Sequence, residues 1–307
     1  MSLSLGNTTI GSIYLGSTKI GEAYLGSTKV YSSADPYNPL GLPPFTIRCK
    51  FKSGTTPTMG DSQTLVDATN NVWDITKNST DWQKLFLRNK DLLEVLGANA
   101  SSVTGVFLMF SGCESLTSVQ LFDTSSVTEM RGMFDSCASL TTVPLFDTSS
   151  VTNMFNMFIF CTSLTTVPLF DTSSVTNMVD MFGYCANLTT VPLFDTSSAT
   201  DMSGMFESCT SLTSVPLFNT SSVTLIGYMF SECTSLTSVP LFDTSSVTDM
   251  ESAFENCTRV EHGALALYQQ ASSQATPPDS HDRCFRSCGS STATGRAELA
   301  QIPTGWK

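Results

Sequence analysis

Residues 126–149 read SVTEMRGMFDSCASLTTVPLFDTS, and residues 150–173 repeat the pattern as SVTNMFNMFIFCTSLTTVPLFDTS. The clearest marker of this repeat is a cysteine that recurs every 24 residues, at Cys113, Cys137, Cys161, Cys185, Cys209, Cys233 and Cys257. A fixed period of this length indicates stacked units, because one unit cannot bury its own apolar side chains. The sequence therefore predicts a solenoid.

The first half of each unit has the spacing of a short helix. In residues 126–137, the apolar side chains fall on one helical stripe, formed by Val127, Met130, Met133, Phe134 and Cys137. Ser126 followed by Glu129 is a capping-box pattern, which marks a helix start. We therefore expect a helix of about three turns in every unit.

The second half of each unit predicts a strand. Residues 140–146, LTTVPLF, contain an L-x-x-V-x-L run that is typical of the strand in a leucine-rich solenoid. A proline follows the valine in most units, and we expect very short strands because proline has no N–H to donate. The predicted fold class is therefore α/β: a right-handed leucine-rich-repeat solenoid. Its core would consist of ladders of Val, Met, Phe, Cys and Leu side chains.

The chain divides into five segments. Residues 1–31 carry a ten-residue repeat (LGNTTIGSIY, LGSTKIGEAY, LGSTKVY) that predicts short β-hairpins and an attachment module. Residues 32–44 are a Pro-rich linker, and residues 45–78 alternate apolar and polar side chains, which predicts a β-rich cap with an Asn-Asn turn. The repeats occupy residues 79–260, and residues 261–307 form a C-terminal cap.

The C-terminal cap departs from the repeat pattern. Its residues 263–274 predict a helix that ends before Pro277 and Pro278. Residues 299–303 are expected to form the last strand of the solenoid.

Composition excludes several kinds of protein. Among 307 residues, 15 Lys and Arg face 27 Asp and Glu, which gives a net charge of −12. This charge argues against binding to nucleic-acid phosphates or to anionic lipid. No apolar run is long enough to predict a transmembrane helix. The N-terminal sequence MSLSLGNTTIGSIYLG lacks the features of a secretory signal, so we expect folding in the cytoplasm.

The repeat resembles a known family of bacterial surface proteins. Residues 200–221, TDMSGMFESCTSLTSVPLFNTS, carry the M-F-x-x-C-x-x-L-x-x-[VIL] mark of BspA-type leucine-rich repeats. This resemblance covers residues 79–260 and implies adhesion or protein binding without catalytic residues. The ten-residue repeat is similar to short repeats that open tail and adhesin proteins of phages infecting gut Bacteroidetes. These resemblances imply a virion-associated protein, with a bacterial cell-surface protein as the alternative.

The cysteines and aspartates of the repeat predict structural roles. Each cysteine ends the apolar stripe, and a buried thiol packs as a small apolar group. A zinc site of His281, Cys284 and Cys288 is the alternative, but the F-x-x-C pattern already explains Cys288. An aspartate after each strand predicts a turn, with calcium between units as the alternative. We therefore predict no metal and no cofactor.

Comparison of the units with one another points to a binding surface. They differ after the first Met and before the Cys, at positions that we expect to be exposed on the convex face. Large apolar residues gather there in the central units, and the predicted ligand- or partner-binding residues are Phe155, Ile159, Phe160, Val179, Tyr184 and Tyr228. Exposed aromatic side chains are typical of interaction sites. Burial of part of this set is the alternative.

The sequence thus predicts a non-enzymatic adhesion protein that binds a protein or glycan on a bacterial or host cell surface. It would belong to a phage tail, and residues 1–31 would attach it to the virion or to an oligomeric partner. A virion decoration or spacer protein, whose aromatic surface is a subunit interface, is one alternative. A bacterial cell-surface adhesin is the other. We expect no membrane insertion.

Overall fold

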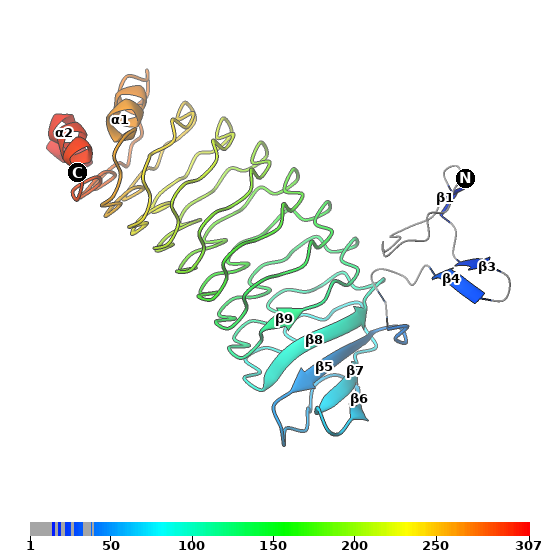
Figure 1. The fold of residues 1–307 in the computed structure, drawn as a ribbon. Helices are drawn as coiled ribbons and strands as arrows, with labels where there is room; N and C mark the ends of the chain where they lie inside the picture. Colours follow the sequence, from blue (N-terminus) through cyan, green and yellow to red (C-terminus); the bar gives the residue numbers. More distant parts are fainter. Residues whose placement is uncertain (1–13, 16–17, 20–21, 26–27, 33–37, 39) are drawn as a thin grey trace.

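The computed structural model shows an elongated stack of coils that leads from a β-sheet to two helices (Figure 1). It describes residues 14–15, 18–19, 22–25, 28–32, 38 and 40–307. Within these residues, no helix has both the length and the apolar character needed to cross a membrane.

The N-terminal repeat contains two short antiparallel strand pairs. Strand β1 (Tyr14–Leu15) pairs with β2 (Thr18–Lys19), and β3 (Glu22–Leu25) pairs with β4 (Thr28–Ser32). The turns of the predicted hairpins, the first ten-residue repeat up to residue 13, and residues 33–37 and 39 of the predicted linker lie outside the described residues.

A five-stranded sheet with the order β6-β7-β5-β8-β9 begins the solenoid. Its strands are β5 (Thr46–Phe51), β6 (Ser62–Asp67), β7 (Val72–Thr76), β8 (Leu92–Asn99) and β9 (Ser118–Val119). Strand β5 buries Ile47, Cys49 and Phe51 in the same core as Trp82 of the first coil. Asn71, with a φ of 53°, makes the tight turn between β6 and β7. The sheet closes the end of the stack.

The predicted helix in each repeat is wrong. Residues 126–137 and their equivalents form consecutive turns, because two residues of each coil adopt a left-handed backbone. In this coil they are Gly132 and Ser136, with φ values of 55° and 58°. A right-handed helix cannot continue through such residues.

The backbone hydrogen bonds explain why turns replace the helix. The N–H of Met133 donates to the Met130 carbonyl of the same coil, whereas the N–H of Phe134 donates to the Met157 carbonyl of the next coil. A helix would direct all its N–H groups along its own axis. Turns leave every second N–H free to join neighbouring coils, and this stacking is what buries the apolar side chains.

The predicted strand of each repeat is also wrong for most coils. Isolated parallel bridges join the coils instead, in the series Asp81, Gly105, Glu129, Asn153, Asn177, Asp201, Leu225 and Asp249. Among the described coils, only the first two have a strand at this position, namely β8 and β9. Gln120 follows β9 where later coils have proline. The N–H of Gln120 donates to the Val95 carbonyl at 2.9 Å, a bond that proline cannot make.

The described helices lie in the C-terminal cap. Helix α1 (Ala264–Ser272) forms in the stretch where a helix is predicted. Helix α2 (Ala293–Gln301) and the 3-10 helix η1 (Thr304–Trp306) replace the predicted last strand, which is therefore wrong. The Thr292 side chain accepts a hydrogen bond from the N–H of Gly295 and caps α2.

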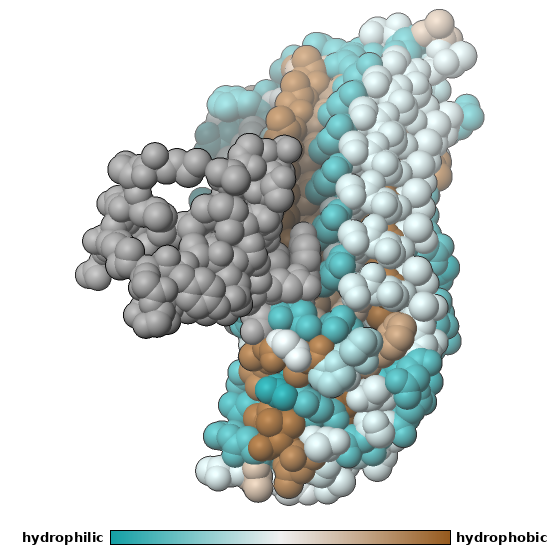
Figure 2. Space-filling view, turned by 90° about the vertical axis from the view of Figure 1, so that its right-hand side faces the viewer, coloured by the Kyte–Doolittle hydropathy of each residue, from teal (hydrophilic) through white to brown (hydrophobic). Residues whose placement is uncertain are grey.

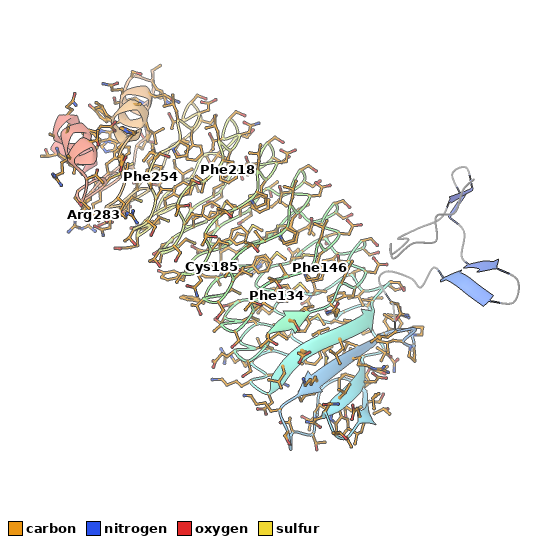
Figure 3. All side chains as sticks on the ribbon, in the orientation of Figure 1. Phe134, Phe146, Cys185, Phe218, Phe254 and Arg283 are labelled. Atoms are coloured by element: carbon orange, nitrogen blue, oxygen red, sulfur yellow. The ribbon has the colours of Figure 1, made fainter. Side chains whose placement is uncertain are left out.

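The core consists of ladders of identical side chains (Figure 3). The Phe182 ring lies 5.6 Å from the Phe158 ring and 5.7 Å from the Phe206 ring, measured between centroids. Each repeat cysteine is buried and unpaired, and the Cys185 thiol donates to the Phe158 carbonyl at 3.1 Å. Burial raises the pKa of Cys185 to about 12, so the thiol keeps its proton.

Candidate functional site

The structure divides the predicted binding residues by exposure. The side chains of Phe160 and Tyr228 are 44% and 40% exposed, and Phe155, Val179 and Tyr184 are half-buried. The prediction is wrong for Ile159, which is only 8% exposed. Gly183 follows it in the next coil, and a Cβ at Gly183 would lie 3.5 Å from the Ile159 Cγ1. Ile159 therefore packs against the backbone of Gly183 in the next coil.

Phe160 and Tyr184 form an aromatic pair across two coils. Their ring centroids lie 4.6 Å apart, and the rings are inclined by 24°. The Tyr184 hydroxyl donates to Glu207 Oε1 at 2.6 Å, which raises the pKa of Tyr184 to about 12. The pair is therefore held in place from a third coil, and its free edges face the solvent.

A second ladder on the same turns alternates cations with aromatic rings. The Arg131 guanidinium lies 4.8 Å from the Phe107 ring centroid and 5.6 Å from the Phe155 ring centroid. Lys84 Nζ lies over the same Phe107 ring, 5.6 Å from its centroid. Each such contact contributes about 0.5–1 kcal/mol at an exposed site. Phe155 is thus fixed by Arg131, and Val179 continues the row in the next coil.

Tyr228 does not join these residues. It lies almost two coils beyond Tyr184, and its hydroxyl donates to Glu251 Oε1 at 2.8 Å. We name the surface formed by Phe107, Arg131, Phe155, Phe160, Val179 and Tyr184 the aromatic surface.

The backbone at the aromatic pair is unfavourable for large side chains. Phe160 and Tyr184 have φ values of 60° and 61°, in the left-handed region that bulky residues rarely adopt. The equivalent position holds Ser136 in the preceding coil and Ser208 in the following one. Because the coil forms equally well with serine, the fold itself does not require an aromatic residue here.

Sequence reasoning missed a second exposed feature. We name as the leucine stripe a row of side chains that are 54–62% exposed: Leu145, Leu169, Leu193, Leu217 and Leu241. Figure 2 shows an apolar stripe along the solenoid, beside a hydrophilic row and a wide surface of weakly polar residues. The predicted core ladder of Leu side chains is formed by Leu140 and its equivalents, which are buried, whereas the second leucine of each L-x-x-V-x-L run is exposed. The available signal was the buried Phe that follows each leucine, because neighbouring residues of an extended chain point to opposite sides.

An aspartate row accompanies the leucine stripe. Asp171 Oδ1 accepts hydrogen bonds from the N–H and the hydroxyl of Ser173, at 3.1 and 2.7 Å, and these bonds lower the pKa of Asp171. Asp147 and Asp195 make the same turn. Nowhere in the described part of the chain do three or more His, Cys, Asp or Glu side chains gather as a metal site would require. The predicted turn role of these aspartates is thus observed.

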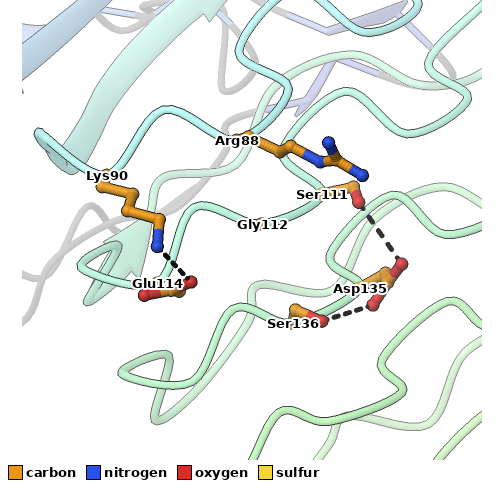
Figure 4. A pocket seen from close by; sticks show the side chains of 7 residues that line it. All are labelled: Arg88, Lys90, Ser111, Gly112, Glu114, Asp135 and Ser136. Carbon is orange, nitrogen blue, oxygen red and sulfur yellow. Dashed lines mark hydrogen bonds and ion pairs between the residues drawn. The ribbon is translucent and has the colours of Figure 1, made fainter.

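A polar pocket of about 400 Å³ lies near the start of the solenoid (Figure 4). Lys90 Nζ contacts Glu114 Oε1 at 2.9 Å, and the Ser136 hydroxyl donates to Asp135 Oδ1 at 2.7 Å. Ser111 contacts Asp135 Oδ2 at 3.3 Å. The polar side chains of this pocket therefore bind mainly one another.

The sequence matches the model of a family described as "Mycoplasma protein of unknown function, DUF285" over residues 59–169 and 160–266. No curated protein matches it.

The solved structures similar to this chain include bacterial leucine-rich repeat proteins. One, TpLRR from T. pallidum, is 26% identical with a TM-score of 0.40, over 50% of this chain and 69% of that one. Another, from Eubacterium ventriosum ATCC 27560, is 16% identical with a TM-score of 0.38, over 69% of this chain and 62% of that one.

Proposed function

The chain belongs to the family described as Mycoplasma protein of unknown function, DUF285, and we propose that it is a non-enzymatic binding protein. Its solenoid would present the aromatic surface to a ligand. The observation that carries this proposal is the Phe160–Tyr184 pair, stacked at 4.6 Å and built on left-handed backbone where serine also fits. Large aromatic side chains at such positions are typical anchors of interfaces.

The ligand would be a protein or a glycan on a bacterial or host cell surface. Aromatic rings contribute a large apolar contact area, and Tyr184 adds a hydroxyl at the edge. Arg131 and Glu207 flank the rings and supply charges of both signs. Leucine-rich repeat proteins are generally non-enzymatic binding proteins. The similarity of this chain to such proteins is in keeping with a binding role.

The location of the protein is a finer proposal. The ten-residue repeat of residues 1–31 would attach it to a phage tail or an oligomeric partner, through the linker at residues 32–44. The β-rich cap at 45–78 and the C-terminal cap at 261–307 would close the repeats at 79–260. Support comes from the resemblance of the ten-residue repeat to those of phage tail and adhesin proteins. A bacterial cell surface is the alternative location.

Binding of labelled full-length protein to a panel of intact bacteria tests the function. The variant carries Phe155→Ser, Phe160→Ser and Tyr184→Ser. Serine should be tolerated at these positions, because Ser203 and Ser208 occupy the equivalent positions of a later coil. We expect saturable binding by the wild type. The variant should bind at least about tenfold more weakly at an unchanged melting temperature. Equal binding by both proteins would contradict the role of the aromatic surface.

A structural role is the second candidate, and the charge distribution favours it. Lys84, Arg88 and Lys90 lie at one end of the turns, and Glu232 and Glu251 lie towards the other end. Two copies in antiparallel contact would match these charges around the aromatic pair. A decoration or spacer protein of this kind would form an oligomer that Phe160→Asp dissociates. A monomeric wild type at micromolar concentration in sedimentation would contradict it.

A further inference from the structure

We propose that the leucine stripe and its aspartate row bind a cationic amphipathic helix of a partner protein. This surface shares no residue with the aromatic surface, so the inference goes beyond the proposed function. It rests on the spacing of the leucines, on the charge beside them and on one contact within the chain itself.

The spacing of the coils matches the pitch of a helix. Phenylalanine rings on successive coils lie 5.4–5.7 Å apart along the ladder from Phe110 to Phe230. In the ladder that follows the leucines, the distances are 5.2 Å between Phe122 and Phe146 and 6.4 Å between Phe218 and Phe242. An α-helix rises about 5.4 Å per turn. A helix laid along the stack therefore meets about one leucine per turn. Four such intervals separate Leu145 from Leu241, which is about 22 Å, or about 15 residues of helix.

The surface between the leucines is hollowed. One depression is lined by Leu145, Leu169, Asp147 and Asp171, and a second by Leu193, Leu217 and Asp195. Apolar side chains of a helix can enter such depressions, in the manner of helices that bind in grooves. Each depression also brings an aspartate next to the leucines.

The aspartate row gives the partner its charge. Asp171, Asp195 and Asp243 accept hydrogen bonds from the serines two residues on, and their pKa values are lowered, so they are ionised at neutral pH. The second carboxylate oxygen of each, Oδ2, makes no hydrogen bond with the described residues. Lys or Arg side chains can bind these oxygens, whereas phosphates and acidic helices are repelled.

One contact within the chain places a leucine from outside the repeat at a position equivalent to the stripe. Gly97 takes the stripe position two repeats before Leu145, and a Cβ at Gly97 would lie 3.0 Å from Leu40 Cδ1. Leu40 therefore occupies the space of the missing leucine. Asn99, at the position of the aspartate row, donates to the Leu42 carbonyl at 2.8 Å. Apolar and polar contacts are thus made side by side, as we propose for the partner.

The probe is a synthetic helical peptide of about 18 residues that contains only Leu and Lys, with Leu on one face. Fluorescence anisotropy measures its binding to the full-length protein. The variant Leu169→Ser, Leu193→Ser, Leu217→Ser changes exposed side chains, so it should fold as the wild type does. We expect its affinity to fall at least about tenfold. An unchanged dissociation constant, or no saturable binding by the wild type, overturns the proposal.

A matched set isolates the charge. Asn219 already makes the turn of the row, since its Oδ1 accepts from the N–H and hydroxyl of Ser221 at 3.2 and 2.8 Å. The variant Asp147→Asn, Asp171→Asn, Asp195→Asn therefore keeps the turns while removing charge. We expect weaker binding with a smaller salt dependence. A peptide with Glu in place of Lys should not bind, and equal binding of that peptide contradicts the proposal.

Two further measurements distinguish other occupants. A wild-type oligomer that Leu193→Ser dissociates in sedimentation overturns the proposal in favour of a second copy. A carbodiimide cross-link within one chain, between Lys19 or Lys29 and the aspartate row, overturns it in favour of the chain's own N-terminal segment. The variant Phe160→Ser should bind the peptide as the wild type does. Loss of binding by the aromatic surface can therefore be distinguished from loss of binding by the leucine stripe.

Discussion

The first coil and the central coils bury the same kinds of side chains but join their backbones differently. In the first coil, β8 pairs with both β5 and β9, so a sheet connects the chain segments. In the central coils, Pro168 and its equivalents remove a donor, and no strand forms there. On the proline side of these coils, stacked rings and side-chain donors act beside the backbone bonds that join the coils at their turns. One such donor is the Thr172 hydroxyl, which bonds the Asp195 carbonyl at 2.7 Å. Regular side-chain ladders can therefore take the place of a strand ladder on one side of the stack, while the turns keep their backbone bonds between coils.

The largest effect is expected from removing one ring of the side-chain ladder in a central coil. Phe182→Ala removes a fully buried ring between Phe158 and Phe206 and leaves a cavity that the rigid stack cannot close. We expect a loss of about 3–5 kcal/mol in the free energy of unfolding, measured by denaturant titration. Phe160→Ala, on the exposed surface, is the control. A loss below about 1 kcal/mol for Phe182→Ala would show that this ladder does not hold the coils together.

The next effect concerns the thiol ladder. Cys185→Ala removes an apolar atom from the core and the hydrogen bond to the Phe158 carbonyl, so we expect a loss of about 2 kcal/mol in the free energy of unfolding. Cys185→Val keeps the apolar volume without the donor. Denaturation of both variants separates packing from hydrogen bonding. If Cys185→Val is as stable as the wild type, the thiol bond contributes nothing.

A smaller effect is expected from making the junction between the first two coils like the junctions between the central ones. Gln120→Pro removes the N–H that bonds the Val95 carbonyl, while five later coils show that proline fits this position. We expect a loss of about 1 kcal/mol in the free energy of unfolding. Faster amide hydrogen exchange in β8 and β9 should accompany it. Gln120→Ala keeps the N–H and should be close to neutral, so equal losses for the two variants would refute this explanation.

The smallest effect is expected at a position where two neighbouring central coils carry different residues. Burial, with the charges of Glu207 and Asp201, raises the pKa of Asp180 to about 6, and the preceding coil has Asn156 at this position. The native protein therefore binds a proton more tightly than the unfolded chain does, and ionisation above this pKa costs stability.

Asp180→Asn should therefore raise the free energy of unfolding at pH 8, by about 1 kcal/mol because Asp180 is only half-buried. The advantage over the wild type should shrink as the pH falls through about 6 and become constant below about 4. Denaturation of both proteins at pH 4, 6 and 8 measures it. A difference that does not change with pH would contradict the assignment to Asp180.

Much of the interior follows from the sequence, and less of the surface does. The period of 24 residues predicts a stack, and Met130, Phe134 and Cys137 are buried as their spacing predicts. The binding residues are only partly predictable: Phe160 and Tyr184 come together, but Ile159 is buried over Gly183 of the next coil. A side chain's exposure depends on its neighbour one coil away, which no pattern within a single unit reports.

The sequence by itself determined the period, the identity of the core ladders and the turns made by each Asp and the serine two residues on, because these depend on apolar spacing and local hydrogen bonds. Only the tertiary structure decided that the coils contain turns instead of helices, and that Leu145 faces the solvent while Phe146 is buried. Both outcomes have the same physical reason. Half of the backbone N–H groups in the turns bond the next coil, so the stack, and not the isolated unit, selects the conformation of the chain.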